Sequence, residues 1–273
     1  MSAAHVLLDN TLLPATAACI PATCEGFLYG HGIFETIKVL NSRPVFLAHH
    51  HVRLTASCRA LDLAYADDLE TLHERLQRVI TANALTDGFA KIVLFARDPT
   101  PGELITTRPG LYPADTYARG FHLRTVFTGE RTGAISGHKT INYLANIRAK
   151  RAALAEGFDE SLFLTPAGIV IEGATTNVFV VRHGVALTPP SACGPLPGIA
   201  RGRVLALLGP DRAREALLTR ADLEHAEEIF VTNARLGVMP VSRLDERRLD
   251  LEHTPVTRAL AHVYRAAELQ SLL

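Results

Sequence analysis

The chain has 273 residues and carries equal numbers of basic (Lys and Arg) and acidic (Asp and Glu) side chains, 28 of each. A chain without excess positive charge is not expected to bind nucleic acid. The N-terminus lacks the basic and apolar regions of a signal peptide, and no apolar run is long enough to span a bilayer. The sequence therefore predicts a cytoplasmic protein with no membrane contact.

Hydrophobic periodicity predicts alternating strands and helices. In the first part of the chain we expect strands at His5–Leu8, Phe34–Leu40, Pro44–Leu47 and Lys91–Ala96, and helices at His50–Leu61 and Asp68–Asn83. Residues 98–118 hold several prolines and glycines, which predicts a long loop at a domain boundary. Further on we expect strands at Phe121–Phe127, Ser161–Leu164, Ile169–Ile171, Asn177–Val181, Val185–Thr188 and Glu228–Thr232, and helices at Ile141–Glu156, Val204–Leu208 and Pro255–Leu269.

This order of elements predicts an α/β (α+β) fold with two domains. A small N-terminal domain is expected over residues 1–115, and a connection with the first strand of the next domain over 116–133. A larger C-terminal domain would then cover residues 134–273. A cleft between two domains is a favoured place for a cofactor.

Lysine is rare in this chain, since only four of the 28 basic residues are lysines. Any imine-forming chemistry must use one of these four, because arginine cannot form the imine. Lys91 opens an apolar strand and Lys150 lies within a helix, so both are expected to be ordinary edge or surface charges. Lys139 lies where a glycine-bearing connection meets a helix, from which it can project into a cleft. Taken alone, such a lysine is more often a solvated charge.

Two further segments could take part in binding or catalysis, but neither is a specific signal when taken alone. Leu196–Gly202 (LPGIARG) precedes an apolar helix, and the N–H groups at a helix start can bind phosphate; a structural turn is the simpler alternative. Glu172 ends a buried strand at a glycine turn, where it can face a pyridine nitrogen or simply be solvated. Three adjacent histidines, His49–His51, point in different directions on a helix, so no metal site is predicted.

Together, five segments resemble the motifs of class IV aminotransferases, in the family's order and over nearly the whole chain. These segments are Gly30–Thr36, His50–Leu54, Lys139–Leu144, Glu172–Phe179 and Leu196–Arg201. One such glycine motif alone would carry no weight. The resemblance implies the two-domain fold type IV of D-amino-acid and branched-chain aminotransferases, a pyridoxal 5′-phosphate cofactor bound mainly by the C-terminal domain, and a homodimer. The segment Phe27–Tyr29 would contribute to the partner's active-site mouth.

The resemblance also implies roles for individual residues. Lys139 would hold the cofactor covalently and move protons, and Glu172 would keep the pyridine nitrogen protonated so that the ring acts as an electron sink. Tyr143 would hydrogen-bond the ring hydroxyl, and Leu196 would pack against the ring.

The phosphate would be held by the Arg53 guanidinium and by the backbone N–H groups of Ile199 and Ala200. The family often has threonine at position 200, so one side-chain contact to the phosphate is expected to be missing here. The remaining contacts implied are Asn177 and Asn233 for the cofactor and Phe34 for the substrate.

Three activities share this scaffold, and two segments favour 4-amino-4-deoxychorismate lyase, an enzyme of folate biosynthesis that forms 4-aminobenzoate and pyruvate. Thr36 stands where branched-chain enzymes usually carry glycine, and its hydroxyl would assist release of the leaving group. Thr232–Val241 resembles the lyase's segment near the phosphate. The alternatives are an aminotransferase for D-amino acids or branched-chain L-amino acids, and a non-catalytic protein that binds the cofactor. Arg97 is a candidate for the substrate carboxylate, or else a strand-end arginine in a structural ion pair.

Overall fold

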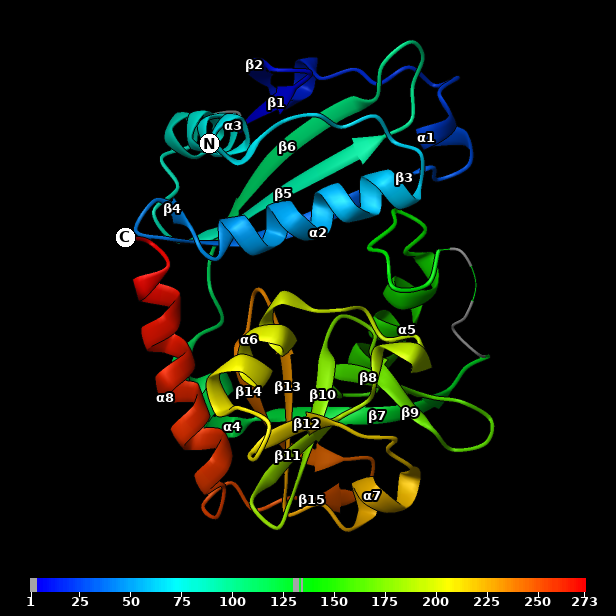
Figure 1. The fold of residues 1–273 in the computed structure, drawn as a ribbon, viewed down its shortest axis with the longest axis vertical. Helices are drawn as coiled ribbons and strands as arrows, with labels where there is room; N and C mark the ends of the chain where they lie inside the picture. Colours follow the sequence, from blue (N-terminus) through cyan, green and yellow to red (C-terminus); the bar gives the residue numbers. More distant parts are fainter. Residues whose placement is uncertain (1–3, 130–132, 134) are drawn as a thin grey trace. The chain divides into compact units, whose positions relative to one another are not determined.

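The computed structural model describes residues 4–129, 133 and 135–273, which form two compact units (Figure 1). The first unit comprises the chain up to Leu111 together with His138–Asn142 and Glu268–Leu273. The second comprises Tyr112–Gly137 and Tyr143–Ala267. The chain passes from the first unit to the second after Leu111, and the segment with Lys139 belongs to the first unit.

The first unit is built on a six-stranded sheet with the strand order β2-β1-β6-β5-β3-β4. Neighbouring strands are antiparallel throughout this order. The strands are β1 (His5–Leu8), β2 (Thr11–Pro14), β3 (Gly32–Leu40), β4 (Arg43–Pro44), β5 (Gly88–Phe95) and β6 (Gly102–Pro109). A 3-10 turn (Ala15–Ala17) and the short helix α1 (Glu25–Leu28) precede β3.

Two helices, α2 (Leu47–Ala60) and α3 (Leu69–Ala82), pack on one face of this sheet. The side chain of Asp68 caps α3 by accepting a hydrogen bond from the Thr71 N–H at 2.8 Å. Ile33, Ile37 and other alternate residues of the strands form a buried core with both helices. Because side chains alternate along a strand, Phe34 and Thr36 lie on the opposite face of the sheet.

The segment His138–Asn142 is hydrogen-bonded to the N-terminal end of β3. The Phe34 N–H donates to the carbonyl of Lys139 at 2.8 Å, and the Ile141 N–H donates to the carbonyl of Gly32 at 3.0 Å. Gly30 has a positive φ of 69°, and a Cβ there would lie 2.4 Å from Asn142 Oδ1. The glycine before β3 therefore allows this segment to approach, which brings Lys139 next to Phe34.

The second unit is built on a nine-stranded sheet whose main path is β12-β11-β10-β13-β14-β7-β8-β9, with β15 paired to β14. β7 runs parallel to both β14 and β8, whereas β10, β13 and β14 are antiparallel neighbours. The strands are β7 (Phe121–Phe127), β8 (Glu160–Leu164), β9 (Val170–Gly173), β10 (Asn177–Arg182), β11 (Val185–Thr188), β12 (Ala213–Glu215), β13 (Glu228–Asn233), β14 (Gly237–Leu244) and β15 (Arg247–Arg248).

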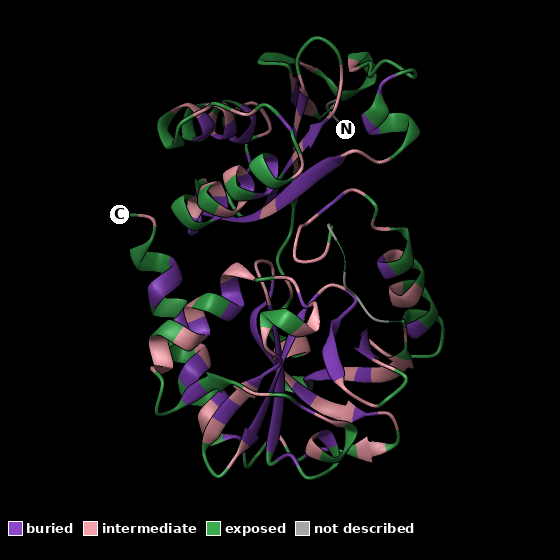
Figure 2. Ribbon diagram, turned by 45° about the vertical axis from the view of Figure 1, so that its right-hand side comes forward, coloured by how far each residue is buried: buried purple, intermediate pink, exposed green. Residues whose placement is uncertain are grey.

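The helices of this part are α4 (Ala114–Arg119), α5 (Leu144–Ala155), α6 (Ile199–Leu208), α7 (Arg220–Glu224) and α8 (Pro255–Gln270), with a 3-10 turn at Ser191–Cys193. The central strands of the sheet are buried (Figure 2). Phe179 of β10 and Phe230 of β13 are cross-strand partners whose rings stack with centroids 4.8 Å apart. These buried central strands give a packed base for the turns at their ends.

Two sequence-based predictions about the first half were wrong. Residues 98–118 are not a long loop, because β6 pairs with β5 along its whole length and α4 follows it. The prolines that favoured a loop lie before β6, at its end or just before α4, where they disturb little pairing. The strand expected at Pro44–Leu47 is the two-residue β4, and Leu47 begins α2 after Phe46 turns the chain with a φ of 52°.

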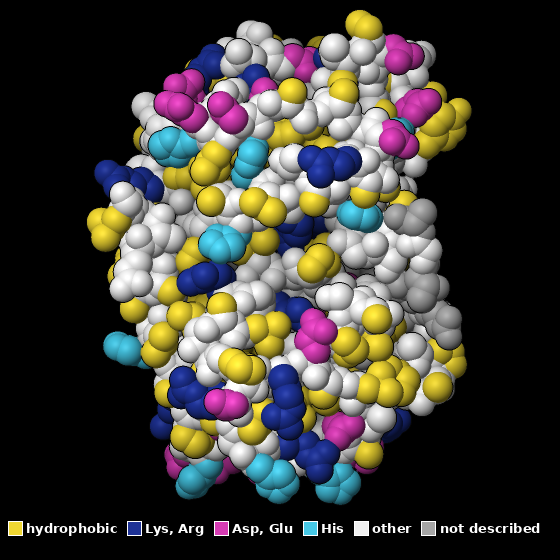
Figure 3. All heavy atoms as spheres, in the orientation of Figure 1, with side chains coloured by type: hydrophobic (Ala, Val, Ile, Leu, Met, Phe, Trp, Pro, Cys, Tyr) yellow, Lys and Arg dark blue, Asp and Glu magenta, His cyan; other side chains and the backbone are white. Residues whose placement is uncertain are grey.

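Acidic and basic side chains are interspersed on the face of each unit seen in Figure 3. No helix in the described part of the chain is long and apolar enough to cross a bilayer. Among the same residues, no group of three or more His, Cys, Asp or Glu side chains has an arrangement that could hold a metal ion.

Candidate active site

A cluster of four side chains lies on β3, β5 and the Lys139 segment of the first unit; we call it the lysine cluster. The ammonium groups of Lys139 and Lys91 lie 4.5 and 4.3 Å from the centroid of the Phe34 ring. Thr36 and Lys91 are directly opposed in the register of β3 and β5, so both side chains lie on the face that carries Phe34. The lysine cluster thus consists of Phe34, Thr36, Lys91 and Lys139.

Lys91 is exposed, in agreement with the surface charge that the sequence predicted. Its ammonium group also packs against an aromatic ring, and the desolvation of that group lowers the pKa of Lys91. A ring face attracts a cation, but two ammonium groups on one ring repel each other. The charge of the Lys91 ammonium group would favour a negatively charged ligand at this ring.

Arg53 of α2 is held by a buried carboxylate of β3. Its Nε and Nη2 donate to the two oxygens of Glu35 at 2.7 and 2.6 Å. His50 Nδ1 lies 2.7 Å from Glu35 Oε2, and both side chains are 2% exposed. A planar guanidinium bound through one edge is fixed in orientation. The family resemblance implied a phosphate for Arg53, but Glu35 and His50, which orient its guanidinium, were not predicted.

The charges of this trio follow from burial and neighbours. Burial favours the neutral form of Glu35, but the Arg53 charge and the contact with His50 outweigh it and lower the pKa of Glu35 to about 2. Burial is also the main reason that the pKa of His50 is lowered, and the positive charges of Arg53 and Lys139 add to this effect. Glu35 is therefore ionised at neutral pH and receives a hydrogen bond from neutral His50.

Arg97, a candidate for the substrate carboxylate, takes part in a pair within the first unit. Its Nη1 lies 2.5 Å from Asp9 Oδ2, and its Nε donates to the carbonyl of Thr100 at 3.4 Å. This contact is a structural ion pair, which was the alternative role that the sequence allowed for Arg97. The role of Arg97 toward a substrate stays a prediction, and Lys91 is the cation that lies beside Thr36.

In the second unit, Glu172 is a buried carboxylate in a defined orientation. Its Oε2 accepts the backbone N–H of Leu196 at 2.9 Å and the side-chain amide of Asn177 at 3.2 Å. The same amide donates to the carbonyl of Leu196 at 2.9 Å. Asn177 thus ties the carboxylate at the end of β9 to the segment before α6, which brings three of the sequence-predicted site residues together.

The start of α6 has the properties of an anion site. The helix spans Ile199–Leu208, and Gly198 precedes it without a side chain that could cap it. A Cβ on Gly198 would lie 1.9 Å from Asn177 Oδ1, so only glycine fits here. The N–H groups of Ile199 and Ala200 lie in the first turn, where backbone donors lack helical partners and the helix dipole favours negative charge.

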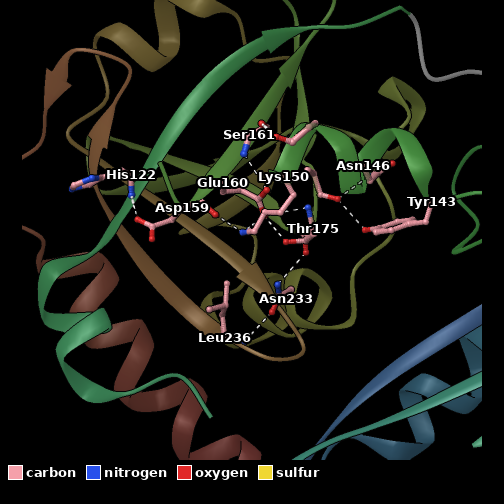
Figure 4. A network of polar contacts seen from close by, with 12 residues as sticks. His122, Tyr143, Asn146, Lys150, Asp159, Glu160, Ser161, Thr175, Asn233 and Leu236 are labelled. Atoms are coloured by element: carbon pink, nitrogen blue, oxygen red, sulfur yellow. Dashed lines mark hydrogen bonds and ion pairs between the residues drawn. The ribbon is translucent and has the colours of Figure 1, made fainter. Parts of the chain in front are cut away.

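Tyr143 and Asn233 contact the turn that joins β9 to β10. The Tyr143 hydroxyl donates to the carbonyl of Ala174 at 2.9 Å, and Asn146 donates to the same oxygen at 2.7 Å (Figure 4). Asn233 donates to the carbonyl of Thr175 at 3.0 Å. A phenolic oxygen that donates its proton retains the capacity to accept one.

Lys150 was also expected to be an ordinary surface charge, and this prediction was wrong. Its Nζ lies 3.5 Å from Glu160 Oε2, a carboxylate that is fully buried, and it donates to the carbonyl of Asp159 (Figure 4). Neither Glu160 nor Lys150 lies in one of the five motifs. Their pairing depends on how α5 packs beside β8.

Comparisons with known proteins agree on one family. The model of the family "Amino-transferase class IV" matches residues 32–244. The branched-chain-amino-acid aminotransferase of Salmonella typhimurium is 28% identical over 246 residues, which cover 80% of this chain and 77% of that protein. The aminodeoxychorismate lyase of Bacillus subtilis is 28% identical over 259 residues, covering 88% of this chain and 87% of the lyase.

A crystal structure is similar over almost the whole chain. It is the branched-chain aminotransferase of Thermoproteus uzoniensis with norvaline, which is 27% identical and superimposes with a TM-score of 0.87. The similarity covers 98% of this chain and 95% of the other. The described fold is therefore that of the fold type IV enzymes.

Proposed function

The chain belongs to the class IV aminotransferases, a family of pyridoxal-phosphate-dependent enzymes, and from that premise we propose that it is a 4-amino-4-deoxychorismate lyase. In this proposal the products are 4-aminobenzoate and pyruvate. The relatives include both aminotransferases and a lyase, so similarity alone does not select the reaction. The choice rests on the side chains of the lysine cluster.

The residues present fit the cofactor. Glu172 is a buried carboxylate held by two hydrogen bonds, which suits a partner for a protonated pyridine nitrogen. The uncapped start of α6 suits the phosphate. In the proposal, Lys139 holds the cofactor and Arg53 binds its phosphate.

The bound cofactor supplies an electron sink that stabilises negative charge on the carbon bearing the substrate's amino group. Lys139 Nζ takes the proton from that carbon as a general base. Glu172 keeps its hydrogen bonds to Leu196 and Asn177 and would hold the cofactor nitrogen in its protonated form. The Thr36 hydroxyl orients the ether oxygen of the leaving group and assists its proton transfer. Expulsion of the three-carbon group as pyruvate leaves an aromatic ring, which drives the reaction forward.

The observation that carries the lyase proposal is the Lys91 ammonium group at the Phe34 ring, directly opposite Thr36 in the register of β3 and β5. 4-Amino-4-deoxychorismate has two carboxylates, one on the ring and one on the ether-linked group, whereas alanine and leucine have one. We assign Lys91 to one of these carboxylates. A charge-assisted hydrogen bond at this position favours the substrate with the additional negative charge.

The second candidate is an aminotransferase for branched-chain L-amino acids or D-amino acids. The observation in its favour is the similarity to branched-chain aminotransferases in sequence and fold. An aminotransferase needs a keto acid to complete each cycle, and a lyase does not. Incubation of the holoenzyme with 4-amino-4-deoxychorismate alone therefore tests the proposal, and equal amounts of 4-aminobenzoate and pyruvate are the expected products.

The homodimer and the cytoplasmic location remain proposals from the family resemblance. Phe27 and Tyr29 of the segment expected at the partner's active site are 69% and 72% exposed in the single chain. Large exposed aromatic side chains are compatible with burial against a second copy.

A further inference from the structure

The turn of residues 173–176 joins two residues that we assign to the cofactor. Glu172 precedes the turn in β9, and Asn177 follows it as the first residue of β10. The Gly173 N–H donates to the carbonyl of Thr176 at 2.7 Å, which closes the turn. Any change in the conformation of this turn would move the Glu172 carboxylate.

A buried carboxylate outside all sequence motifs holds the turn from within the second unit. Glu160 is the first residue of β8 and is 0% exposed. Its Oε2 accepts the backbone N–H of Thr175 at 3.2 Å and also the hydroxyl of Thr175 (Figure 4). Its Oε1 accepts the N–H of Ser161 at 3.0 Å. The carboxylate thus binds the centre of the turn through both the backbone and the side chain of one residue.

Lys150 supports this carboxylate from α5, with its Nζ 3.5 Å from Glu160 Oε2. Burial raises the pKa of Glu160, and the Lys150 charge and the hydrogen bonds from Thr175 oppose this effect. Buried ion pairs contribute little net stability compared with apolar residues of the same size. The pair is therefore better explained by the geometry that it imposes than by the stability that it adds.

The turn also contacts the other polar residues assigned to the cofactor ring. The carbonyl of Ala174 accepts from Tyr143 at 2.9 Å, and that of Thr175 accepts from Asn233 at 3.0 Å. One rigid turn thus connects Glu172, Tyr143 and Asn233. Glu160 holds this turn in position through its hydrogen bonds with Thr175.

We propose that Glu160 is a positioning residue: by binding Thr175 it fixes the 173–176 turn, and through the turn it sets the places of the Glu172 carboxylate and the Tyr143 hydroxyl. The inference rests on the cofactor roles given under the proposed function. It does not depend on whether the reaction is that of a lyase or an aminotransferase, because it concerns the cofactor before any substrate binds.

The test compares the cofactor absorbance of the holoenzyme with that of three variants. Glu160→Gln keeps the side-chain shape but removes one acceptor oxygen, and Glu172→Gln removes the proposed ring partner directly. Glu228→Gln is the matched control, because Glu228 is 3% exposed in the same unit and accepts two backbone N–H groups at the start of α8, at 3.0 and 2.8 Å. For each protein, the pH at which the visible band changes, the cofactor dissociation constant and the melting temperature are measured.

We expect Glu160→Gln to shift the pH of the band change in the same direction as Glu172→Gln but by less, and to weaken cofactor binding several-fold. Glu228→Gln is expected to lower the melting temperature while leaving the band unchanged. A spectrum of Glu160→Gln identical to that of the unaltered protein would overturn the inference, as would an equal shift in Glu228→Gln. If Glu172→Gln itself leaves the spectrum unchanged, the assignment of Glu172 fails, and the inference fails with it.

Thr175→Val tests the same contact from its other side, so the inference stays testable even if Glu160→Gln does not fold. It removes the hydroxyl bound to Glu160 without changing the side-chain shape. The expected result is a smaller shift of the band in the same direction, and no further shift in the double variant beyond that of Glu160→Gln, since both changes break one interaction. An unchanged spectrum in Thr175→Val, or fully additive shifts, would contradict the positioning role.

Discussion

Arg53 donates to both carboxylate oxygens of Glu35, from Nε at 2.7 Å and from Nη2 at 2.6 Å. The carboxylate lies on β3 and the arginine on α2, so this contact fixes the helix to the sheet as well as the guanidinium in space. A phosphate-binding arginine that is already oriented loses less side-chain entropy when its ligand binds. The contact therefore links the stability of the first unit to the proposed phosphate site.

The first prediction concerns the pH dependence of stability. Because the pKa of Glu35 is lowered from 4.5 to about 2 by Arg53 and His50 against the effect of burial, its ionised form stabilises the folded state. This stabilisation is complete above pH 4.5 and is lost as the pH falls toward 2. Glu35→Gln should lower the free energy of unfolding by about 3 kcal/mol at pH 7. The deficit should shrink below pH 4.5.

Urea unfolding at pH 7 and at pH 3.5 measures this difference. Glu103→Gln provides the control, because burial raises the pKa of Glu103 even though Arg75 lies 3.1 Å away. Its substitution should not become less costly as the pH falls. A deficit for Glu35→Gln that is the same at both pH values would show that Glu35 contributes through packing and not through its charge.

The second prediction identifies the lysine that holds the cofactor. Reduction of the holoenzyme with borohydride should fix the cofactor to Lys139, because this lysine lies at Phe34 on the segment that pairs with β3. Peptide mapping locates the label. Lys91 is the most informative alternative, since its ammonium lies at the same ring. A label on Lys91 would exchange the roles of the two lysines in the proposal.

The motif residues could be proposed from the sequence because each motif is contiguous. The turn before β3, the Lys139 segment and the start of α6 all contain local signals such as glycines and a proline. Lys91 and Glu160 belong to no motif. Lys91 meets Thr36 only through the register of β3 and β5, and Glu160 meets Thr175 only through the packing of β8 beside the turn. Partners of this kind are set by tertiary contacts, which a local pattern does not contain.

The same distinction explains the error at β6. Its composition around residues 98–118 favours a loop, yet β6 pairs with β5 from Gly102 to Pro109. A Cβ on Gly102 would lie 2.2 Å from the Phe95 ring, so this glycine is required for strand pairing at that ring. Gly102 lets the Phe95 ring pack closely against the backbone of the neighbouring strand. In a sequence without structural context, a glycine more often indicates a turn.

The third prediction tests the electron sink. Glu172→Gln keeps the shape of the side chain but removes the carboxylate that we assign to the pyridine nitrogen. Turnover should fall a hundredfold or more, on the order of 3 kcal/mol of lost transition-state stabilisation. The cofactor should remain bound, because the residues assigned to the phosphate are unchanged. Steady-state kinetics and cofactor absorbance measure the two effects, and near-normal turnover would mean that the ring is tuned by another group.

The fourth prediction concerns Lys91 and the substrate. If its ammonium binds a carboxylate, Lys91→Met should raise the KM for 4-amino-4-deoxychorismate by ten- to a hundredfold, with a smaller change in kcat, since a hydrogen bond to a charged group contributes about 1.5–3 kcal/mol. Lys91→Arg keeps the charge and should recover part of the affinity. Equal KM values for the Met variant and the unaltered enzyme would exclude Lys91 from substrate binding.

The reaction is tested most directly by giving the holoenzyme 4-amino-4-deoxychorismate, D-alanine and L-leucine in separate experiments, each without a keto acid. The lyase proposal predicts continuous release of 4-aminobenzoate and pyruvate in equal amounts from the first substrate, and at most one slow half-reaction with the two amino acids. Product analysis and the cofactor absorbance distinguish these outcomes. No 4-aminobenzoate, together with rapid conversion of the cofactor to its pyridoxamine form by D-alanine or L-leucine, would contradict the lyase and identify an aminotransferase.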